Sequence, residues 1–454
     1  MFKDAFIYLL SKLIPAALGI GILFIYLTSM PPEVYGVYSL SLITLGLFNV
    51  LTTQWIRSSM LRFYNDKVEN FMGKIFYFVI IVTIINVIIV GLLVWYTKFS
   101  FVTFIIATVL ITNIIYFEVM NNYYRTIILP KKVLIANILK NLSLVIILLL
   151  FVNFFSELTL DSALLIYSIS LLISNIYYFL NFKEIVYIEY DRKLLKPFLD
   201  YGIPLSLSFA LGIILQNIDK YFITIILGTE YNGYYSLAYD FIHNSLYMIM
   251  GSLSMASLPR ILKSNRENFN SDFLKYINYF YAISFPFLVI SISISTEIVT
   301  ILNRYGYELS IFVVVMITIA TFIQGVNSFV YNQAVQLLKQ TSIIIVPVLV
   351  AVIVTVIINV TLLGKVGIVA AAVSSVVAFS TSNYLIIVKL RKIDSIRVMP
   401  KNILIHLVLA TIMTAVLFNL FIINIFMTVL IKVILTIMGY IFYYYIFKKS
   451  IRRI

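Results

Sequence analysis

FYFVIIVTIINVIIVGLLVWY, residues 76–96, is the stretch that decides the fold class, because it is apolar over its whole length. A helix that crosses a bilayer needs about 20 mostly apolar residues, and it satisfies its backbone polar groups internally. A transmembrane β-strand would alternate apolar and polar residues, which this stretch does not. It therefore predicts a membrane-spanning helix.

The rest of the chain has the same character. Of its 454 residues, 62% are hydrophobic and 11% are charged, whereas a globular protein carries roughly 25% charged residues. The absence of cysteine excludes disulfides, thiol catalysis and cysteine-based metal sites, and two histidines are too few for a histidine-rich one. We expect no catalytic residues, no metal site and no cofactor.

Hydropathy predicts an all-α membrane protein with about 14 transmembrane helices. The charged start is followed by no small-residue cleavage site, so the first helix is expected to be retained. The predicted spans are 5–27, 35–56, 75–96, 101–124, 133–155, 162–181, 201–227, 234–258, 273–296, 309–332, 342–363, 366–388, 403–423 and 426–447.

Basic residues test this map, because short cytoplasmic loops of membrane proteins collect lysine and arginine. With the N-terminus inside, most of the 33 basic residues fall in inside segments, and the outside loops hold only Lys98, Arg304 and Lys365. Both termini are therefore predicted to be cytoplasmic. The net charge of +14 then faces anionic membrane lipid, so we expect no nucleic-acid partner. The longest predicted loop, 182–200, has no room for a catalytic domain, so the chain is predicted not to be an enzyme.

Two segments at the same topological point repeat each other. EVYGVYSL (33–40) opens the second span and EYNGYYSL (230–237) opens the eighth, with identical Glu, Gly and Tyr-Ser-Leu positions at one constant offset. Both spans run from outside to inside, which predicts two six-helix halves related by an axis along the membrane normal. Chance similarity in a chain rich in Tyr, Ile and Leu is the alternative. The predicted domains are residues 1–196 and 197–390, two six-helix bundles, and residues 391–454, two additional helices.

These residues carry a family resemblance. KDAFIYLLSKLIPAALG (3–19), EVYGVYSL (33–40), residues 201–241 and LGKVGIVAAAVSSVVAF (363–379) resemble the polysaccharide transporter family, which includes the Wzx-type O-antigen and capsule repeat-unit flippases. That family belongs to the multidrug/oligosaccharidyl-lipid/polysaccharide exporter (MOP) superfamily. The most specific motif consists of Asp219, Lys220, Leu227, Gly228, Gly233, Tyr235, Ser236, Ala238 and Tyr239.

The resemblance implies two helical bundles around a central cavity in the bacterial inner membrane. It also implies flipping of undecaprenyl-diphosphate-linked oligosaccharide by alternating access, with membrane lipid as surroundings and a polysaccharide polymerase and chain-length machinery as partners. Whether Na⁺ or H⁺ drives transport is left open. A cation-coupled small-molecule exporter of the same superfamily is the alternative function, and it should carry an acidic rather than a basic cavity. A membrane polymerase or ligase of the same pathway is the third hypothesis for the function.

Ionisable residues inside spans cost at least about 2.5–3.5 kcal/mol each and are functional candidates by default. The inner layer is net positive and suits a diphosphate, and the spacing of its span-four members places them on one helix face. Snorkelling of long basic side chains is the structural alternative. The candidate substrate-binding residues of this layer are Lys12, Arg57, Glu118, Asn122, Arg125 and Lys140.

A second layer lies toward the outer side. Asp219, Lys220, Asp240 and His243 are candidates for a gate or an ion-coupling site, against a structural network that locks the seventh and eighth spans together. Lys432 is another basic residue inside a predicted span. On span ten, Gln324 and Asn327 share a stripe of amide and hydroxyl groups that suits either sugar hydroxyls or interhelical hydrogen bonds.

Overall fold

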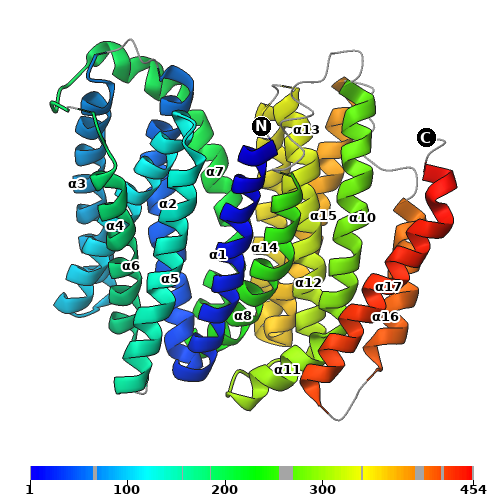
Figure 1. The fold of residues 1–454 in the computed structure, drawn as a ribbon. Helices are drawn as coiled ribbons and strands as arrows, with labels where there is room; N and C mark the ends of the chain where they lie inside the picture. Colours follow the sequence, from blue (N-terminus) through cyan, green and yellow to red (C-terminus); the bar gives the residue numbers. More distant parts are fainter. Residues whose placement is uncertain are drawn as a thin grey trace. The chain divides into compact units, whose positions relative to one another are not determined.

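The computed structural model describes residues 2–64, 69–155, 157–184, 186–254, 269–338, 341–393, 403–420 and 424–451, whose regular structure is helical throughout. The chain divides into two compact units, Met1–Gly233 and Tyr234–Ile454. Figure 1 labels the helices of both units.

Unit 1 holds seven long helices and the start of an eighth. They are α1 (Phe2–Ser29), α2 (Pro32–Phe63), α3 (Phe71–Thr97), α4 (Phe101–Thr126), α5 (Pro130–Phe155), α6 (Leu160–Leu180), α7 (Arg192–Ile226) and α8 (Thr229–Ile242), which continues into unit 2. Within the unit, α2 packs along α7, α1 along α5, and α4 along α6.

Local sequence sets several of these helix ends. Pro32 lies in the first turn of α2, where its missing N–H costs no helical hydrogen bond. Ser100 caps α4 by accepting a hydrogen bond from the backbone N–H of Thr103, and Thr159 and Ser162 form a reciprocal capping box at the start of α6. Short connections thus join the long apolar helices of this unit.

The two repeated segments meet inside unit 1. A Cβ atom on Gly36 would overlap the carbonyl oxygen of Thr229, and a Cβ atom on Gly233 would overlap that of Pro32. Asn232 also donates a hydrogen bond from Nδ2 to the carbonyl of Gly36 at 2.9 Å. The contact is reciprocal, because each glycine packs against the equivalent first-turn residue of the other repeat. Two segments related by a two-fold axis would make such a reciprocal contact. The division of the chain into halves at residue 196 stays a prediction.

An extended strap connects α6 to α7, and we define it as residues 181–184 and 186–191. Asn70 clamps Tyr187 by two hydrogen bonds, from Nδ2 to the Tyr187 carbonyl at 2.5 Å and from the Tyr187 N–H to Oδ1 at 3.0 Å. Tyr123 donates a hydrogen bond to the carboxylate of Glu184. Asp191 caps α7 and forms an ion pair with Lys74 at 2.9 Å.

The Lys74–Asp191 pair predicts an acid-sensitive strap. The hydrogen bond from Lys74 lowers the pKa of Asp191 below its ordinary value of 3.8. A depressed carboxyl pKa contributes stability above the unfolded-state pKa, and this stability is lost as the pH falls through the folded-state value. We expect the fluorescence anisotropy of a probe on Ile188→Cys to fall below about pH 3.8. Asp191→Asn should be mobile at neutral pH already, and identical profiles would contradict the prediction.

Unit 2 completes α8 and adds shorter helical pieces between long ones. The elements are η1 (His243–Tyr247), α10 (Phe269–Ser293), α11 (Ser295–Arg304), α12 (Ile311–Val326), η2 (Asn327–Tyr331), α13 (Asn332–Leu337), η3 (Thr341–Ile344), α14 (Ile345–Val366), α15 (Ile368–Ile393), α16 (Ile403–Phe418) and α17 (Ile425–Ile451). Within the unit, α14 and α12 both pack on α15, and α16 packs on α10.

Two π-turns interrupt helices of unit 2, η1 after α8 and η2 after α12. A π-turn is rare and occurs mostly as a single turn inside an α-helix, frequently at functional sites. The rings of Tyr247 in η1 and Phe329 in η2 lie 4.8 Å apart, and Tyr276 donates a hydrogen bond to the Phe329 carbonyl at 2.6 Å. Hydropathy alone gave no signal for either turn.

A buried ion pair joins α17 to α11, and the same lysine bonds to the end of α10. Lys432 Nζ lies 2.7 Å from Glu297 Oε1 and 2.6 Å from the carbonyl oxygen of Ser293, and the two charged side chains are 0% and 3% exposed. Thr428 and Thr436, one turn to either side of Lys432, are also fully buried. The packed face of α17 is therefore polar there, whereas its other faces carry exposed apolar side chains.

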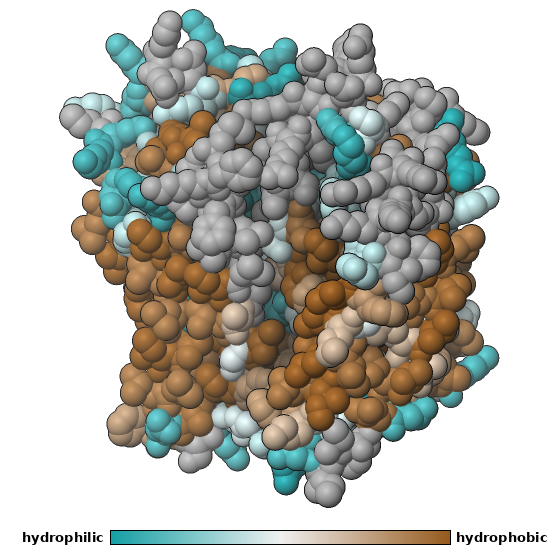
Figure 2. Space-filling model, turned by 45° about the vertical axis from the view of Figure 1, so that its right-hand side comes forward, coloured by the Kyte–Doolittle hydropathy of each residue, from teal (hydrophilic) through white to brown (hydrophobic). Residues whose placement is uncertain are grey.

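The observed helices agree with the predicted spans. Eleven described helices are long and apolar enough to cross a membrane, and Ala17–Ser29 and Ile403–Phe418 are shorter apolar helices. Helical structure also runs from Thr229 through η1 to Ser254, where the eighth span is predicted. Figure 2 shows hydrophobic residues around the middle of the helices and hydrophilic residues near their ends. The chain is a multi-pass membrane protein.

Candidate functional site

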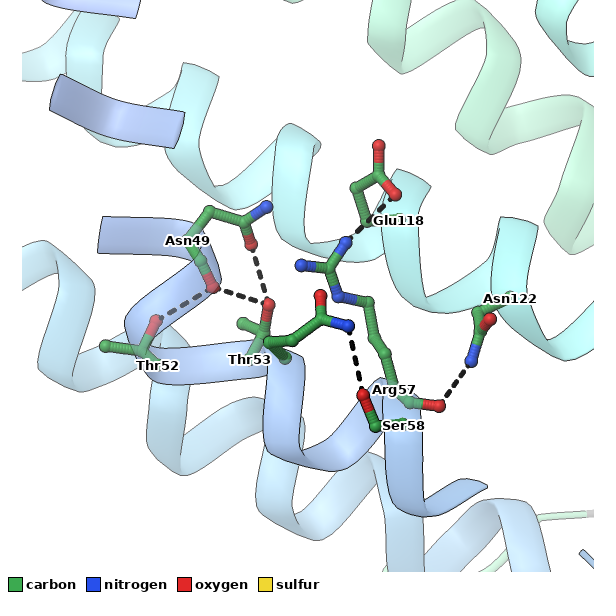
Figure 3. A network of polar contacts seen from close by, with 8 residues as sticks. Asn49, Thr52, Thr53, Arg57, Ser58, Glu118 and Asn122 are labelled. Carbon is green, nitrogen blue, oxygen red and sulfur yellow. Dashed lines mark hydrogen bonds and ion pairs between the residues drawn. The ribbon is translucent and has the colours of Figure 1, made fainter. Parts of the chain in front are cut away.

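Three of the predicted inner-layer residues form a polar cluster between α2 and α4 (Figure 3). Arg57 Nη1 donates a hydrogen bond to Glu118 Oε2 at 3.0 Å, and Asn122 Nδ2 donates one to the Arg57 carbonyl at 2.6 Å. Arg57 was predicted just beyond the span 35–56, but α2 continues to Phe63, so Arg57 lies within the helix. The sequence therefore named three residues that the structure brings together, but it ended the second span too early.

The guanidinium of Arg57 is paired with Glu118 but uses only part of its hydrogen-bonding capacity. Its side chain is 11% exposed, whereas that of Glu118 is 42% exposed. Among the described residues, Arg57 Nε and Nη2 have no hydrogen-bond partner. A guanidinium presents a planar fork of donors that fits carboxylate or phosphate oxygens, and Glu118 occupies one donor of that fork. Nε and Nη2 are both buried in this structure, so they would reach an anion only after the cluster opens.

Neighbouring polar groups on α2 and α3 extend the cluster, and the sequence reading missed them. Thr53 donates to the Asn49 side chain at 2.9 Å, and Gln54 donates to Ser58 at 3.0 Å. Asn86 of α3 donates to the hydroxyl of Thr52 at 2.8 Å. The sequence did contain a signal for two of them. Asn49, Thr53 and Arg57 are spaced four residues apart, so they share one face of α2.

The other inner-layer candidates are placed less closely. Lys140 on α5 is half-buried, and its Nζ lies 5.3 Å from the ring centroid of Phe117, the residue before Glu118. Arg125 is exposed in the last turn of α4. Lys12 lies in α1, but its side chain is outside the described residues. The structure thus joins Arg57, Glu118 and Asn122 and sets Lys140 beside the same stretch of α4.

The amide pair of span ten is buried in unit 2 and bonded to other helices. Gln324 Oε1 accepts a hydrogen bond from the Tyr239 hydroxyl at 3.2 Å. Asn327 Nδ2 donates to Ser382 Oγ at 3.1 Å and to Asn383 Oδ1 at 2.6 Å. These contacts are those expected of interhelical hydrogen bonds, and sugar binding by Gln324 and Asn327 stays a prediction.

The four gate candidates fall in different units. Asp219 and Lys220 are buried on α7 in unit 1, and Asp219 Oδ1 accepts a hydrogen bond from the Lys220 backbone N–H at 3.0 Å. Asp240 is half-buried on α8 in unit 2. The His243 ring stacks between the rings of Tyr239 and Tyr247, with centroids 5.6 and 4.4 Å apart. A gating or coupling role for these residues stays a prediction.

A surface hollow of about 810 Å³ lies elsewhere, at the connection between α3 and α4. Aromatic side chains line it, including Trp95 and Phe101, with Lys98 as its one charged residue. Phe101 opens α4, so it lies more than four turns along that helix from Glu118. Among the described residues, no group of three His, Asp or Glu side chains could hold a metal ion.

Solved structures share this fold. The chain is similar to a lipid II flippase, MurJ, in an inward closed conformation, with 16% identity, a TM-score of 0.78 and 99% of each chain covered. It is also similar to an inward-facing multidrug resistance MATE transporter of the MOP superfamily, with 15% identity, a TM-score of 0.61, and 84% of this chain and 96% of that chain covered.

A third structure is a MOP superfamily transporter from Pyrococcus furiosus whose binding pocket is described as having reverse polarity. It has 14% identity and a TM-score of 0.56, and the match covers 86% of this chain and 95% of that one. At such identities the likeness establishes the fold.

The search of curated proteins found no match to this sequence. A family model described as "polysaccharide biosynthesis protein" matches residues 1–265, more than half of the chain. This stretch includes α1 to α7, the reciprocal Gly36–Gly233 contact and the Arg57 cluster. The chain belongs to the polysaccharide biosynthesis protein family.

Proposed function

We propose that the chain is a flippase that moves undecaprenyl-diphosphate-linked oligosaccharide repeat units across the bacterial inner membrane by alternating access. The product would be O-antigen, capsule or another exopolysaccharide. Family membership supports a role in polysaccharide biosynthesis, and the fold supports a transporter. The chain acts as a transporter rather than an enzyme, with both termini in the cytoplasm and with the pathway's polymerase and chain-length proteins as its partners.

The partly paired guanidinium of Arg57 is the observation that carries this proposal. Burying a charge inside a membrane protein is costly unless the charge is paired, and Glu118 engages only one of the donors. A diphosphate is a compact dianion that could bind the free donors once the cluster opens, with Lys140 nearby on α5. Polar groups of α2 then continue the hydrophilic path along the helix.

Replacing Arg57 by glutamine tests the diphosphate site. Hydrogen bonds to charged groups contribute about 1.5–3 kcal/mol each, so we expect at least roughly tenfold weaker binding of the diphosphate-linked substrate to the purified protein. Arg62→Gln is the matched control, because Arg62 is an exposed arginine of the same helix, stacked on Tyr201. Equal binding by Arg57→Gln and Arg62→Gln, with native helicity in both, would refute the assigned site.

A cation-coupled small-molecule exporter is the second candidate function, and the exposed carboxylate of Glu118 favours it. Glu118→Gln separates the two functions. In a flippase it releases Nη1 of Arg57, so diphosphate binding should be kept or strengthened. In a cation-coupled exporter it removes the carboxylate that would bind the coupling ion or a cationic substrate. The exporter would be supported by two results together. Glu118→Gln would lose cation-dependent dye export, and neither the unmodified protein nor the variant would bind the diphosphate-linked substrate.

A further inference from the structure

The strap between α6 and α7 is held in place but presents apolar side chains outward. Tyr187, Ile188 and Tyr190 are 71%, 63% and 50% exposed. Its backbone is fixed by Asn70, and Gly73 leaves the space that the Tyr187 carbonyl fills. A fixed segment with three exposed large apolar residues in four positions needs an apolar or amphipathic surface to cover them.

That surface can be located from the neighbouring helix. The Tyr190 ring packs on the ring of Tyr77 at 5.4 Å, and Tyr77 stands at the end of a stripe on α3. The stripe continues one and two turns further with Ile81 and Ile84, which are 41% and 55% exposed, and then with Ile88 at 58%. In a membrane-spanning helix an exposed isoleucine stripe faces lipid. The strap therefore lies where the lipid-facing side of α3 ends, at the level of the headgroups.

Basic residues follow directly at the start of α7. Arg192, Lys193 and Lys196 are exposed, and Phe198, two residues on, is fully buried against Phe63 and Phe71. Figure 1 shows the first turns of α7 running across the ends of the unit 1 helices rather than along them. An amphipathic segment with this division of basic and apolar residues is typical of a helix lying in a membrane interface.

The acidic residues nearby are already engaged by protein groups. Glu184 accepts from Tyr123, Asp191 pairs with Lys74, and Glu189 lies 3.4 Å from Asn70 Nδ2. Asp200, further along α7, and Glu69, next to Asn70, are the remaining exposed carboxylates near the segment among the described residues. The exposed basic side chains thus outnumber the unengaged acidic ones.

We propose that residues 186–196 form an interfacial anchor that binds anionic phospholipid headgroups, with Tyr187, Ile188 and Tyr190 inserted at the headgroup level and Arg192, Lys193 and Lys196 contacting the phosphates. This site is separate from the transport substrate and does not depend on the function proposed above. It lies on the side that the basic loops assign to the cytoplasm, where anionic lipids attract basic segments.

Lipid quenching tests the anchor. Because the native chain has no cysteine, Ile188→Cys gives a single attachment point for a fluorophore. The protein is reconstituted in neutral vesicles with a minor fraction of brominated phosphatidylglycerol, or in phosphatidylglycerol vesicles with the same fraction of brominated phosphatidylcholine. We expect stronger quenching by the brominated anionic lipid, because each basic residue near such a surface contributes on the order of a fivefold preference. The preference should fall with salt.

Two triple variants make the test specific. Arg192→Gln, Lys193→Gln and Lys196→Gln combined should abolish the preference for the anionic lipid while some quenching remains. Lys98→Gln, Arg304→Gln and Lys365→Gln combined remove the same charge from exposed residues that the topology assigns to the outer side, and they should leave the preference unchanged. Equal quenching by both lipids in the unmodified segment overturns the proposal. No quenching overturns it as well, because the strap then faces water and is open to a protein partner instead.

Discussion

Replacing Lys432 by methionine will destabilise unit 2 by about 3–5 kcal/mol, the typical cost of removing one partner from a buried ion pair. The mutation leaves Glu297, which is 3% exposed, without its cation and leaves the Ser293 carbonyl without its donor. This carbonyl belongs to the last residue of α10, and the last four carbonyls of an α-helix have no hydrogen-bond partner within that helix. Lys432 therefore serves as a cap for α10 as well as a counter-ion, so both losses occur together.

The double variant Lys432→Met with Glu297→Gln separates charge from packing. With both charges removed, most of the lost stability should return, because a buried pair often contributes little beyond its own desolvation cost. Lys365→Met is the matched control, since Lys365 is an exposed lysine of the same unit. The unfolding temperature of each purified variant in detergent measures the stability of the single variant, the double variant and the control. If the single variant and the control unfold at the same temperature, the pair contributes nothing to stability.

The second large effect concerns the glycines where the repeats meet. Gly36→Ala or Gly233→Ala places a methyl group against a backbone carbonyl that cannot rotate away. The first turns of α2 and α8 must then move apart, at a cost of about 1–3 kcal/mol for overpacking. Because the contact is reciprocal, the second alanine should add less than the first, as substitutions at one contact are not independent.

Cysteine labelling reads out this separation directly. Ser39 is 6% exposed and lies one turn beyond Gly36, and Ser39→Cys is the single thiol in a chain without native cysteine. We expect a maleimide to react faster at this site when either glycine is alanine. Gly46→Ala is the matched control on α2, because nothing lies within 4 Å of its added Cβ. An unchanged rate in all three variants would contradict close packing of the repeats.

The membrane fold was predictable because lipid imposes simple demands on sequence. An apolar run such as 76–96 specifies a spanning helix without knowledge of its neighbours, whereas the orientation derived from loop charge stays a prediction. Boundaries that depend on tertiary contacts were less certain. The seventh span was predicted from residue 201, but α7 begins at Arg192, because Asp191 caps it and its residue Phe198 is buried against Phe63 and Phe71. The thirteenth span was predicted to run to residue 423, but α16 ends at Phe418, and α17 begins at Ile425.

Pairings between distant segments could not be predicted. Lys432 was recognised as a charge inside a span, but its partner Glu297 was predicted to lie just beyond the end of another, and only packing brings the two together. Arg57, Glu118 and Asn122 were named because charge and helical spacing select them. Asn49, Thr53 and Asn86 were missed, because a single asparagine or threonine in a span is ordinary until its neighbours are known. The π-turns were missed because they leave the hydropathy pattern unchanged.

Translocation by the purified protein tests the central claim most directly. The protein is reconstituted in liposomes that carry undecaprenyl-diphosphate-linked oligosaccharide, and the sugar exposed on the outer surface is followed with a membrane-impermeant reagent. We predict protein-dependent movement of the sugar between leaflets, reduced at least about tenfold in Arg57→Gln and unchanged in Arg62→Gln. A correctly folded protein that moves no lipid-linked sugar, and instead exports cationic dyes along an ion gradient, would contradict the account.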